Sequence, residues 1–243
     1  ASDVYKRQIS SNRPKIVVIG SCNTDMVVKA NRLPVPGETI LGGTFYMNPG
    51  GKGANQAIAA ARLGAEVTFI SKIGYDLFGL QALEIYRSEK INTEFIFTDQ
   101  KSPSGVALIS VDSFGENSII VAPGASRSLS TEDINKAEEK IKEADIILMQ
   151  LEVPIDTVEY AATIANRYGK KVILNPAPAS TLSNSFLNNV HTILPNRIEA
   201  EMLSGIKVMD VESAHRAAKA IGEKGIETVS YTHLRAHETL MNL

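Results

Sequence analysis

Short apolar runs typical of buried strands alternate along this chain with amphipathic runs that favour helices. The strand-like runs cover residues 15–21, 67–73, 145–150, 171–174 and 192–194, and another opens at Ile226. The helix-like runs cover residues 54–63, 78–91, 155–168, 198–204 and 211–224. Buried strands that alternate with helices indicate a parallel sheet covered on both faces. We therefore expect an α/β three-layer sandwich with a mostly parallel central sheet, whose strand order stays open.

Two regions break this alternation and predict a second, smaller sheet. Residues 25–30 and 38–47 have the pattern of paired strands, and so do residues 105–112 and 118–122. The second pair is joined by the turn-forming run 113–117, as in a hairpin. Because no helix-like run lies between the members of either pair, we expect these strands to stand apart from the central sheet.

The composition narrows the classes of function. The net charge of the 243 residues is −2, without a long run of one sign, which gives no support to nucleic-acid or membrane binding. No apolar stretch approaches the roughly 18 residues of a membrane span, and no signal-peptide pattern is present. The one cysteine, Cys22, is more typical of a small buried side chain than of a reactive thiol. It fits a reducing compartment, and we expect the cytoplasm.

A glycine-rich segment, Gly50-Gly51-Lys52-Gly53-Ala54-Asn55, joins the run 38–47 to the helix-like run 54–63. Its glycines allow positive φ and let a ligand approach the backbone N–H groups. We expect the free N–H groups at the start of the helix to face the same space. With the charge of Lys52 and the amide of Asn55, the segment suits a small polyhydroxylated or anionic ligand. It is not a nucleotide P-loop, because Gly53 follows Lys52 where Ser or Thr is required. The alternative is a turn that only starts a helix.

Polar side chains follow two of the expected core strands, at the edge where open α/β sheets bind ligands. Asn23 and Asp25 flank Thr24 after the first strand, and Glu152 follows the strand 145–150. Two residues apart on an extended backbone, Asn23 and Asp25 point the same way and can bind neighbouring hydroxyl groups. The alternatives are an Asx turn at Asn23 and a capping or surface role for Glu152.

Asn196 and Glu199 stand at the start of the helix-like run 198–204. An Asn followed three residues later by a Glu is also the pattern of a capping box, which competes with any role in ligand binding. The sequence alone therefore leaves two interpretations of this pair open.

None of the four histidines is expected to be catalytic. His191 and His215 are expected to be packed or solvated. His233 and His237 have the four-residue spacing of a metal pair, but no third ligand lies nearby in the sequence, so we expect no zinc site.

Several of these segments together resemble one family. The N-terminal ones are residues 20–25, 33–39, 50–55, 59–65 and 73–79. In this order and spacing they resemble the signature of the ribokinase-like (PfkB) carbohydrate kinases. Later segments are similar to the ribose-phosphorylating members of that family: residues 104–109, 149–154, 175–179 and 195–201. The resemblance spans roughly residues 14 to 229.

The resemblance implies ATP-dependent phosphorylation of D-ribose to ribose 5-phosphate. It implies that segments at about 25–47 and 105–122 form a lid over the sugar, and that two lids pack together in a homodimer. It places Asn196 near the nucleotide phosphates and Glu199 at magnesium, largely through waters. It assigns the substrate contacts to Asn23, Thr24, Asp25, Gly51, Lys52, Gly53, Ala54, Asn55 and Glu152.

The chain departs from the family pattern in one respect that bears on activity. The resemblance implies a catalytic Asp within a Gly-Ala-Gly-Asp-type motif whose glycines and helix start form an anion hole. No such motif occurs in the 243 residues, nor do the segments expected to hold adenine and a monovalent cation, K⁺. We therefore expect this chain to be inactive by itself. The alternatives are another sugar or nucleoside kinase of the family, or a non-catalytic sugar-binding or dimerising protein.

The two ends of the chain do not fit the domain. Residues 230–239 carry two His, an Arg and a Glu where a buried strand should continue. This run resembles translated sequencing-adapter sequence, and residues 3–8 resemble its N-terminal counterpart. We expect a domain at 14–229, incomplete at its C-terminus, between artefact-like ends at 1–8 and 230–243. A natural divergent tail is the alternative.

Overall fold

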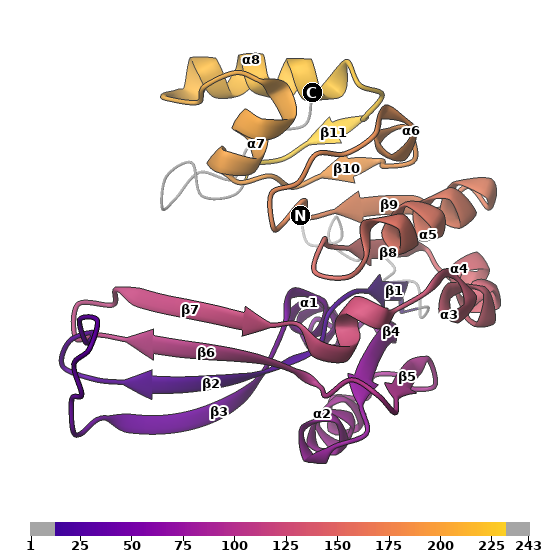
Figure 1. Ribbon diagram of the computed structural model, residues 1–243. Helices are drawn as coiled ribbons and strands as arrows, with labels where there is room; N and C mark the ends of the chain where they lie inside the picture. Colours follow the sequence, from indigo (N-terminus) through magenta and orange to yellow (C-terminus); the bar gives the residue numbers. More distant parts are fainter. Residues whose placement is uncertain (1–12, 232–243) are drawn as a thin grey trace, which may run out of the picture.

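The computed structural model describes residues 13–231, which form a seven-stranded sheet flanked by helices and a second sheet that projects from it (Figure 1). Every strand pairing in the larger sheet is parallel. Its strands in spatial order are β11 (Thr228–Val229), β10 (Thr192–Ile193), β9 (Lys171–Leu174), β8 (Ile146–Met149), β1 (Lys15–Ile19), β4 (Glu66–Gly74) and β5 (Ile96–Asp99).

Helices cover the central sheet on both faces, as strands with buried apolar residues on both faces require. On β1, Val17 and Ile19 belong to one apolar core, whereas Val18 belongs to the other. Successive side chains of the strand therefore pack on opposite faces of the sheet. The core around Val18 packs against α1 (Lys52–Arg62) and α2 (Leu77–Ser88). The larger core includes residues of α3 (Thr131–Lys136), α4 (Glu138–Glu143), α5 (Ile155–Arg167), α6 (Asn184–Leu187), α7 (Arg197–Ser204) and α8 (Val211–Gly222).

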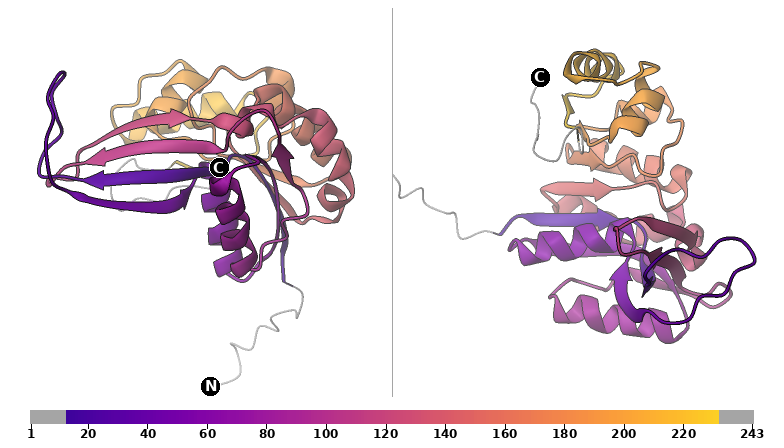
Figure 2. Two further views of the ribbon diagram at one scale, coloured as in Figure 1. Left: turned by 60° about the horizontal axis from the view of Figure 1, so that its bottom comes forward. Right: turned by 90° about the vertical axis from the view of Figure 1, so that its left-hand side faces the viewer.

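The smaller sheet, here called the lid, extends away from the central sheet (Figure 2, left). Its spatial order is β3 (Thr44–Gly50), β2 (Asn23–Lys29), β6 (Gly105–Val111) and β7 (Asn117–Ala122). The pairs β2–β3 and β6–β7 are antiparallel, and β2 joins the two pairs by running parallel to β6. A 3₁₀ helix, η1 (Gly124–Ser128), leads from the lid back to the central domain.

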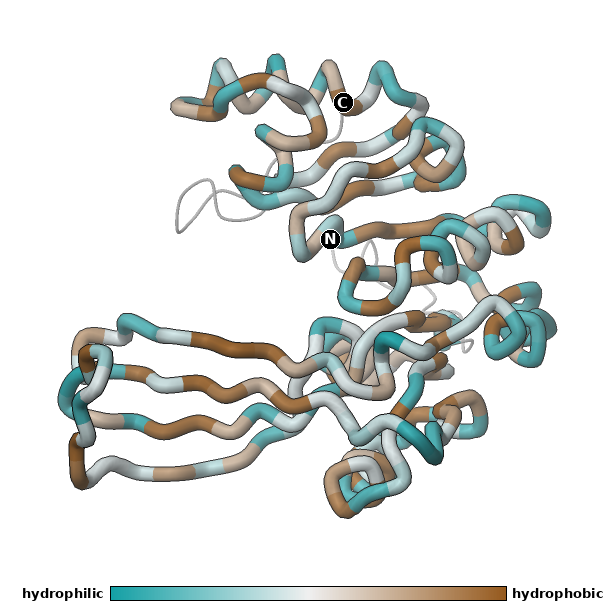
Figure 3. The backbone as a smooth tube through the Cα atoms, in the orientation of Figure 1, coloured by the Kyte–Doolittle hydropathy of each residue, from teal (hydrophilic) through white to brown (hydrophobic). Residues whose placement is uncertain are grey.

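The lid carries apolar side chains that little else in the chain covers. Figure 3 shows hydrophobic colour along its strands, far from the cores of the central sheet. Phe45, Leu108 and Ile120 are 57%, 53% and 69% exposed on one face, and Ile119 is 52% exposed on the other. Both faces of the lid are therefore partly apolar and open in the single chain.

The expected fold class is confirmed: a three-layer α/β sandwich with a parallel central sheet and a separate β-sheet lid. Several element bounds differ from the sequence-based expectation. The strand expected from residue 38 begins at Thr44, because Gly42 and Gly43 adopt φ of 101° and 111°, outside the strand region. The short elements β5, α4 and α6 were not predicted, since four to six residues carry little periodicity.

The predictions for residues 1–8 and 232–243, which include His233 and His237, lie outside the described residues. The first two residues of the expected artefact-like tail are described and pack on the domain. The Ser230 N–H donates to the Ile193 carbonyl (3.0 Å), and the Tyr231 hydroxyl donates to the Ala214 carbonyl (3.0 Å). The boundary at residue 230 stays a prediction. Within residues 13–231, no helix is long and apolar enough to cross a membrane.

Candidate functional site

The site forms where the chain changes direction across the central sheet. From β1 the chain proceeds to β4 and β5 on one side, whereas β8 leads to β9 and β10 on the other. Ligands bind at the carboxyl ends of the strands at such a switch point. Ser21 follows β1 and Glu152 follows β8, so both lie at this edge together with the start of α1.

The carboxylate of Glu152 links three segments that are far apart in the sequence. It forms an ion pair with the Lys52 ammonium and accepts a hydrogen bond from the Ser21 hydroxyl. Its Oε2 also accepts the backbone N–H of Lys52 (2.9 Å). Burial alone raises the pKa of Glu152, but the hydrogen bonds from Lys52 and Ser21 outweigh it, and the net pKa lies below the usual range. Glu152 is therefore ionised at neutral pH and not a surface carboxylate.

The N-terminus of α1 differs from the expectation. The helix begins at Lys52, two residues earlier than expected, with Gly51 as its N-cap at a φ of 88°. Its first N–H groups are not free for a ligand, because the chain itself supplies their acceptors. The Lys52 N–H binds Glu152, the Gly53 N–H lies 3.5 Å from the Ser21 hydroxyl, and the Ala54 N–H binds the Ser21 carbonyl (3.0 Å). The glycine-rich segment thus docks the helix onto the β1–β2 connection.

Asn23 and Asp25 lie on the same face of β2, and each lies over a glycine of a neighbouring strand. A Cβ on Gly105 of β6 would lie 2.1 Å from Asn23 Oδ1, and a Cβ on Gly50 of β3 would lie 1.9 Å from Asp25 Oδ1. Asn23 is 5% exposed, and its Oδ1 has no hydrogen-bond partner within the described chain. The two glycines therefore provide the room that these polar side chains occupy.

The carboxyl group of Asp25 is half-buried, and the charges of both Glu152 and Lys52 affect its pKa. Burial raises its pKa, the nearby negative charge of Glu152 raises it further, and the positive charge of Lys52 opposes both. The net pKa of Asp25 is above its ordinary value. The site thus holds two carboxylates that share one lysine, which leaves hydrogen-bonding capacity for an uncharged hydroxylic ligand.

A cavity of about 370 Å³ lies beside this cluster. Its polar lining includes Ser21, Asn23, Lys52 and Glu152. Its remaining lining is contributed by Val121, Pro123, Arg127, Leu151 and Pro178. The volume suits a monosaccharide, and both the lid and the central domain contribute walls.

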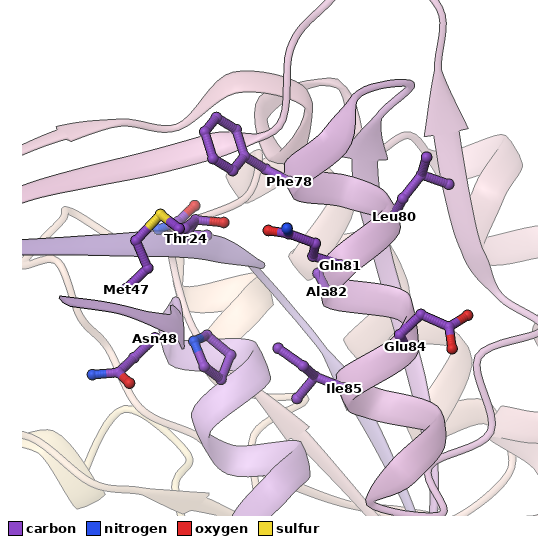
Figure 4. Close-up of a pocket in the computed structure, with 11 residues that line it drawn as sticks. Thr24, Met47, Asn48, Phe78, Leu80, Gln81, Ala82, Glu84 and Ile85 are labelled. Carbon is purple, nitrogen blue, oxygen red and sulfur yellow. The ribbon is translucent and has the colours of Figure 1, made fainter.

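Other predicted contacts lie elsewhere. Thr24 faces the opposite side of β2 and lines a separate cavity of about 480 Å³ with Met47 and Phe78 (Figure 4). Asn55 is exposed on α1, and Ala54 is fully buried beneath it. The structure thus brings Asn23, Lys52 and Glu152 together around one cavity and gives Thr24 a different environment.

Asn196 and Glu199 form the capping box of α7. Asn196 Oδ1 accepts the Glu199 N–H (2.9 Å), and Glu199 accepts from the Asn196 N–H and side-chain amide (2.8 Å each). Glu199 is 5% exposed. With both oxygens already hydrogen-bonded, this carboxylate fits contact with a hydrated magnesium ion through water better than direct ligation, and Mg²⁺ usually keeps several waters. Within residues 13–231 no group of three His, Cys, Asp or Glu could hold a metal directly.

Sequence reasoning missed three contributors to the site. Ser21 stands in the family signature but was given no role, and Gly105 has no signal beyond being a glycine within a strand. Arg127 lies in the 3₁₀ helix η1, where nothing in the local sequence marks a ligand.

Comparison with known proteins shows the family of the chain. The model of the pfkB family of carbohydrate kinases matches residues 13–233. The chain belongs to this family. The ribokinase of Haemophilus influenzae is 46% identical over 220 residues, which cover 90% of this chain and 72% of that protein. The deoxyribokinase of Salmonella typhi is 38% identical over 89% of this chain and 71% of that protein.

A solved structure is similar over the same region. The Arabidopsis thaliana ribokinase, complexed with ribose and ATP, aligns with a TM-score of 0.80 at 30% identity. The alignment covers 90% of this chain and 72% of that chain. The resemblance to ribokinase-like kinases inferred from the motifs is therefore confirmed.

Proposed function

We propose that this protein acts in the ATP-dependent phosphorylation of D-ribose to ribose 5-phosphate. The observation that carries the proposal is the cluster of Ser21, Lys52 and Glu152 beside a monosaccharide-sized cavity at the switch point of the sheet. The names of the relatives support ribose as the sugar. An ATP-using enzyme with a single buried, unpaired cysteine fits the cytoplasm.

In this proposal the sugar hydroxyls bind at the lid-side wall of the cavity. Asp25 and Glu152 accept hydrogen bonds from hydroxyls, and Asn23 offers an amide whose oxygen has no partner within the described chain. Lys52 donates to sugar oxygens in the cavity, and Asn55, which is exposed on α1 and not in the cavity lining, donates at its rim. The backbone of Gly51, Gly53 and Ala54 sets the positions of both side chains. Thr24 contributes to sugar binding by its position on β2, where it separates Asn23 from Asp25 and so keeps their side chains on one face of the strand.

The phosphate donor binds on the β10 side. Asn196, at the start of α7, contacts the nucleotide phosphates, and Glu199 binds the hydrated magnesium ion through water. Magnesium, when bound with ATP, neutralises the charge of the phosphates during transfer. K⁺ belongs to the same proposal, but none of the described residues is assigned to it.

We infer that the 243 residues lack the proton acceptor, because no Gly-Ala-Gly-Asp sequence occurs among them. A coupled assay tests this with two proteins: the chain as given, and a chimera in which a ribokinase C-terminal segment with that motif replaces residues from about 230 onward. We expect ATP-dependent ribose turnover only from the chimera, and we expect an Asp-to-Asn change in its motif to abolish turnover. Turnover by the chain as given would overturn the assignment of the base. A folded chimera without ribose turnover would overturn the proposed reaction.

A second candidate substrate is 2-deoxyribose, which the 38% identity to a deoxyribokinase favours. The same assay with ribose, 2-deoxyribose and a nucleoside separates these substrates. A folded chimera that turns over none of them would favour a non-catalytic sugar-binding protein.

The exposed apolar side chains of the lid support the proposal that two chains form a homodimer through it. Because successive strand residues point to opposite faces, Ile119→Asp and Ile120→Asp test the two faces separately. We expect sedimentation equilibrium to give a dimer for the unmodified protein and a monomer for the variant on the contacting face. If both variants had the same molar mass in solution as the unmodified protein, or if the unmodified protein were a monomer, a dimer formed through the lid would be contradicted.

A further inference from the structure

One charged residue of the sugar cavity has no role in the proposal above. Arg127 lies in η1, is exposed, and lines the same cavity as Lys52 and Glu152. Within residues 13–231 its side chain forms no ion pair or hydrogen bond with the chain itself. It therefore keeps its hydrogen-bond donors for a ligand.

The backbone on both sides of Arg127 is fixed by side-chain contacts. Ser126 is fully buried, and its hydroxyl accepts a backbone N–H from the β1–β2 connection (3.3 Å). The Ser128 hydroxyl donates to Asp99 (2.5 Å), and the Ser128 carbonyl accepts from the partly buried ammonium of Lys72 (3.1 Å). A cation on a fixed backbone loses little conformational freedom when it binds, beyond that of its own side chain.

The charge balance of the cavity points to an anionic ligand group. Among the charged lining residues, Lys52 is paired with Glu152, so these two charges offset each other. Asp25, the second carboxylate near Lys52, is not in the lining. Arg127 then adds a positive charge that an uncharged sugar does not need. A guanidinium group binds phosphate or carboxylate oxygens with two parallel hydrogen bonds.

The position of the cavity favours a phosphate. The lining includes Asn23 and Lys52, and also Pro178, which comes shortly after the end of β9. Strand β9 neighbours β10, and β10 leads to Asn196, where the proposal above places the nucleotide phosphates. A sugar held by Asn23 and Lys52 would therefore receive its phosphoryl group from the side of the cavity toward Pro178.

We propose that Arg127 binds the phosphoryl group of the phosphorylated sugar and makes this cavity prefer sugar phosphate over free sugar. This inference rests on the proposed ribose phosphorylation and assigns that site one more specificity residue. Arg127 acts on the anionic group alone, so the affinity for free ribose does not depend on it.

Calorimetry with D-ribose and with ribose 5-phosphate tests the inference. The proteins are the unmodified chain, Arg127→Ala, Arg127→Lys and the control Arg167→Ala, which removes an exposed arginine at the end of α5. We expect Arg127→Ala to weaken ribose 5-phosphate binding about tenfold or more and to change ribose binding less than about twofold. Arg127→Lys should restore part of the loss, and Arg167→Ala should match the unmodified chain. Higher salt should weaken ribose 5-phosphate binding to the unmodified chain more than to Arg127→Ala.

The outcomes separate this inference from the proposed function. Equal losses for both ligands, or no loss for either, would overturn the role of Arg127 and leave ribose binding standing. Arg127-dependent binding of ribose 5-phosphate without binding of ribose would support Arg127 and contradict ribose as the substrate. Binding of neither ligand by the unmodified chain would overturn both.

Discussion

Two pairs of Asn and Glu residues lie at the carboxyl edge of the central sheet, Asn196 with Glu199 and Asn23 with Glu152, and different contacts hold each pair. On the β10 side, Asn196 and Glu199 are three residues apart and satisfy each other as a capping box. On the β1–β8 side, Glu152 is held by residues 100 and 131 positions away, and Asn23 Oδ1 has no hydrogen-bond partner within residues 13–231. Helix capping accounts for the positions of Asn196 and Glu199 without any ligand. No such local role accounts for the long-range cluster around Glu152, which lies beside a cavity. This difference favours the β1–β8 side as the better-formed binding site.

The largest expected effect comes from breaking the docking of α1 on the β1–β8 side. A Cβ on Gly53 would lie 2.7 Å from backbone atoms of Gly20 and Ser21, which cannot move aside as a flexible side chain can. We expect Gly53→Ala to lower the free energy of unfolding by about 2–3 kcal/mol, through overpacking that exceeds its gain in helix propensity. Thermal melting should show a drop of about 5–10 °C.

Gly222→Ala is the matched control for Gly53→Ala. Gly222 also lies in a helix, but a Cβ there would meet nothing within 4 Å. We expect this variant to be neutral or to gain up to about 1 kcal/mol, because alanine favours the helix. Equal melting temperatures for the two variants would show that the close approach at Gly53 is unimportant.

The next effect concerns ligand affinity on the same side. Asp25→Ala removes a carboxylate placed to accept sugar hydroxyls, and hydrogen bonds to charged groups are worth about 1.5–3 kcal/mol. We expect ribose affinity, measured by calorimetry, to fall about tenfold or more. Glu116→Ala, an exposed change in the β6–β7 turn, is the control and should leave the affinity unaltered. An unaltered affinity in Asp25→Ala would remove this residue from the site.

A smaller effect is expected on the β10 side. Asn196→Ala removes the side-chain cap of α7 and should cost about 1 kcal/mol of stability. Ribose affinity should stay within about twofold of the unmodified chain, because the capping box takes no part in the sugar cavity. If Asn196→Ala lost as much ribose affinity as Asp25→Ala, the two sides would not differ in their part in sugar binding.

The smallest effect is a pair of opposite pH dependences. The pKa of Asp25 is raised in the folded chain, so its ionisation destabilises the fold at pH values above the ordinary pKa of 3.8. Asp25→Asn removes this charge and should therefore raise the melting temperature near neutral pH. The pKa of Glu152 is lowered, so its contribution is present above the ordinary value of 4.5 and is lost as the pH falls through the folded value. Glu152→Gln should therefore lower the melting temperature near neutral pH. Both differences should shrink in acid; shifts of the same sign would contradict the assigned charges.

The sequence predicted the fold more fully than it predicted the site. Alternating apolar strands and helices indicate a parallel sheet, and two pairs of strand-like runs without a helix between them indicated the lid. The parallel pairing of β2 with β6, which unites the lid, joins segments about 80 residues apart and leaves no local signal.

Local patterns predicted part of the geometry at the carboxyl edge of the sheet, and the binding roles of the residues there stay predictions. The motifs around Asn23, Lys52 and Glu152 indicated polar residues at strand ends, and these three meet at one cavity. The role of Ser21 and the placement of Arg127 depend on contacts across the switch point, which sequence spacing does not encode. The free helix N–H groups were predicted wrongly, because Ser21 and Glu152 supply acceptors that only the fold brings near.

The central claim is that the cluster around Glu152 forms a ribose site. Calorimetric titration of D-ribose into the unmodified chain, Glu152→Gln and the control Glu212→Gln tests it most directly. Glu212 is an exposed carboxylate on α8, far along the sequence from the cavity. The account predicts saturable binding of one ribose per chain, a loss of about tenfold or more in Glu152→Gln, and no change in Glu212→Gln. Equal affinity in all three proteins, or no ribose binding by the unmodified chain, would contradict it.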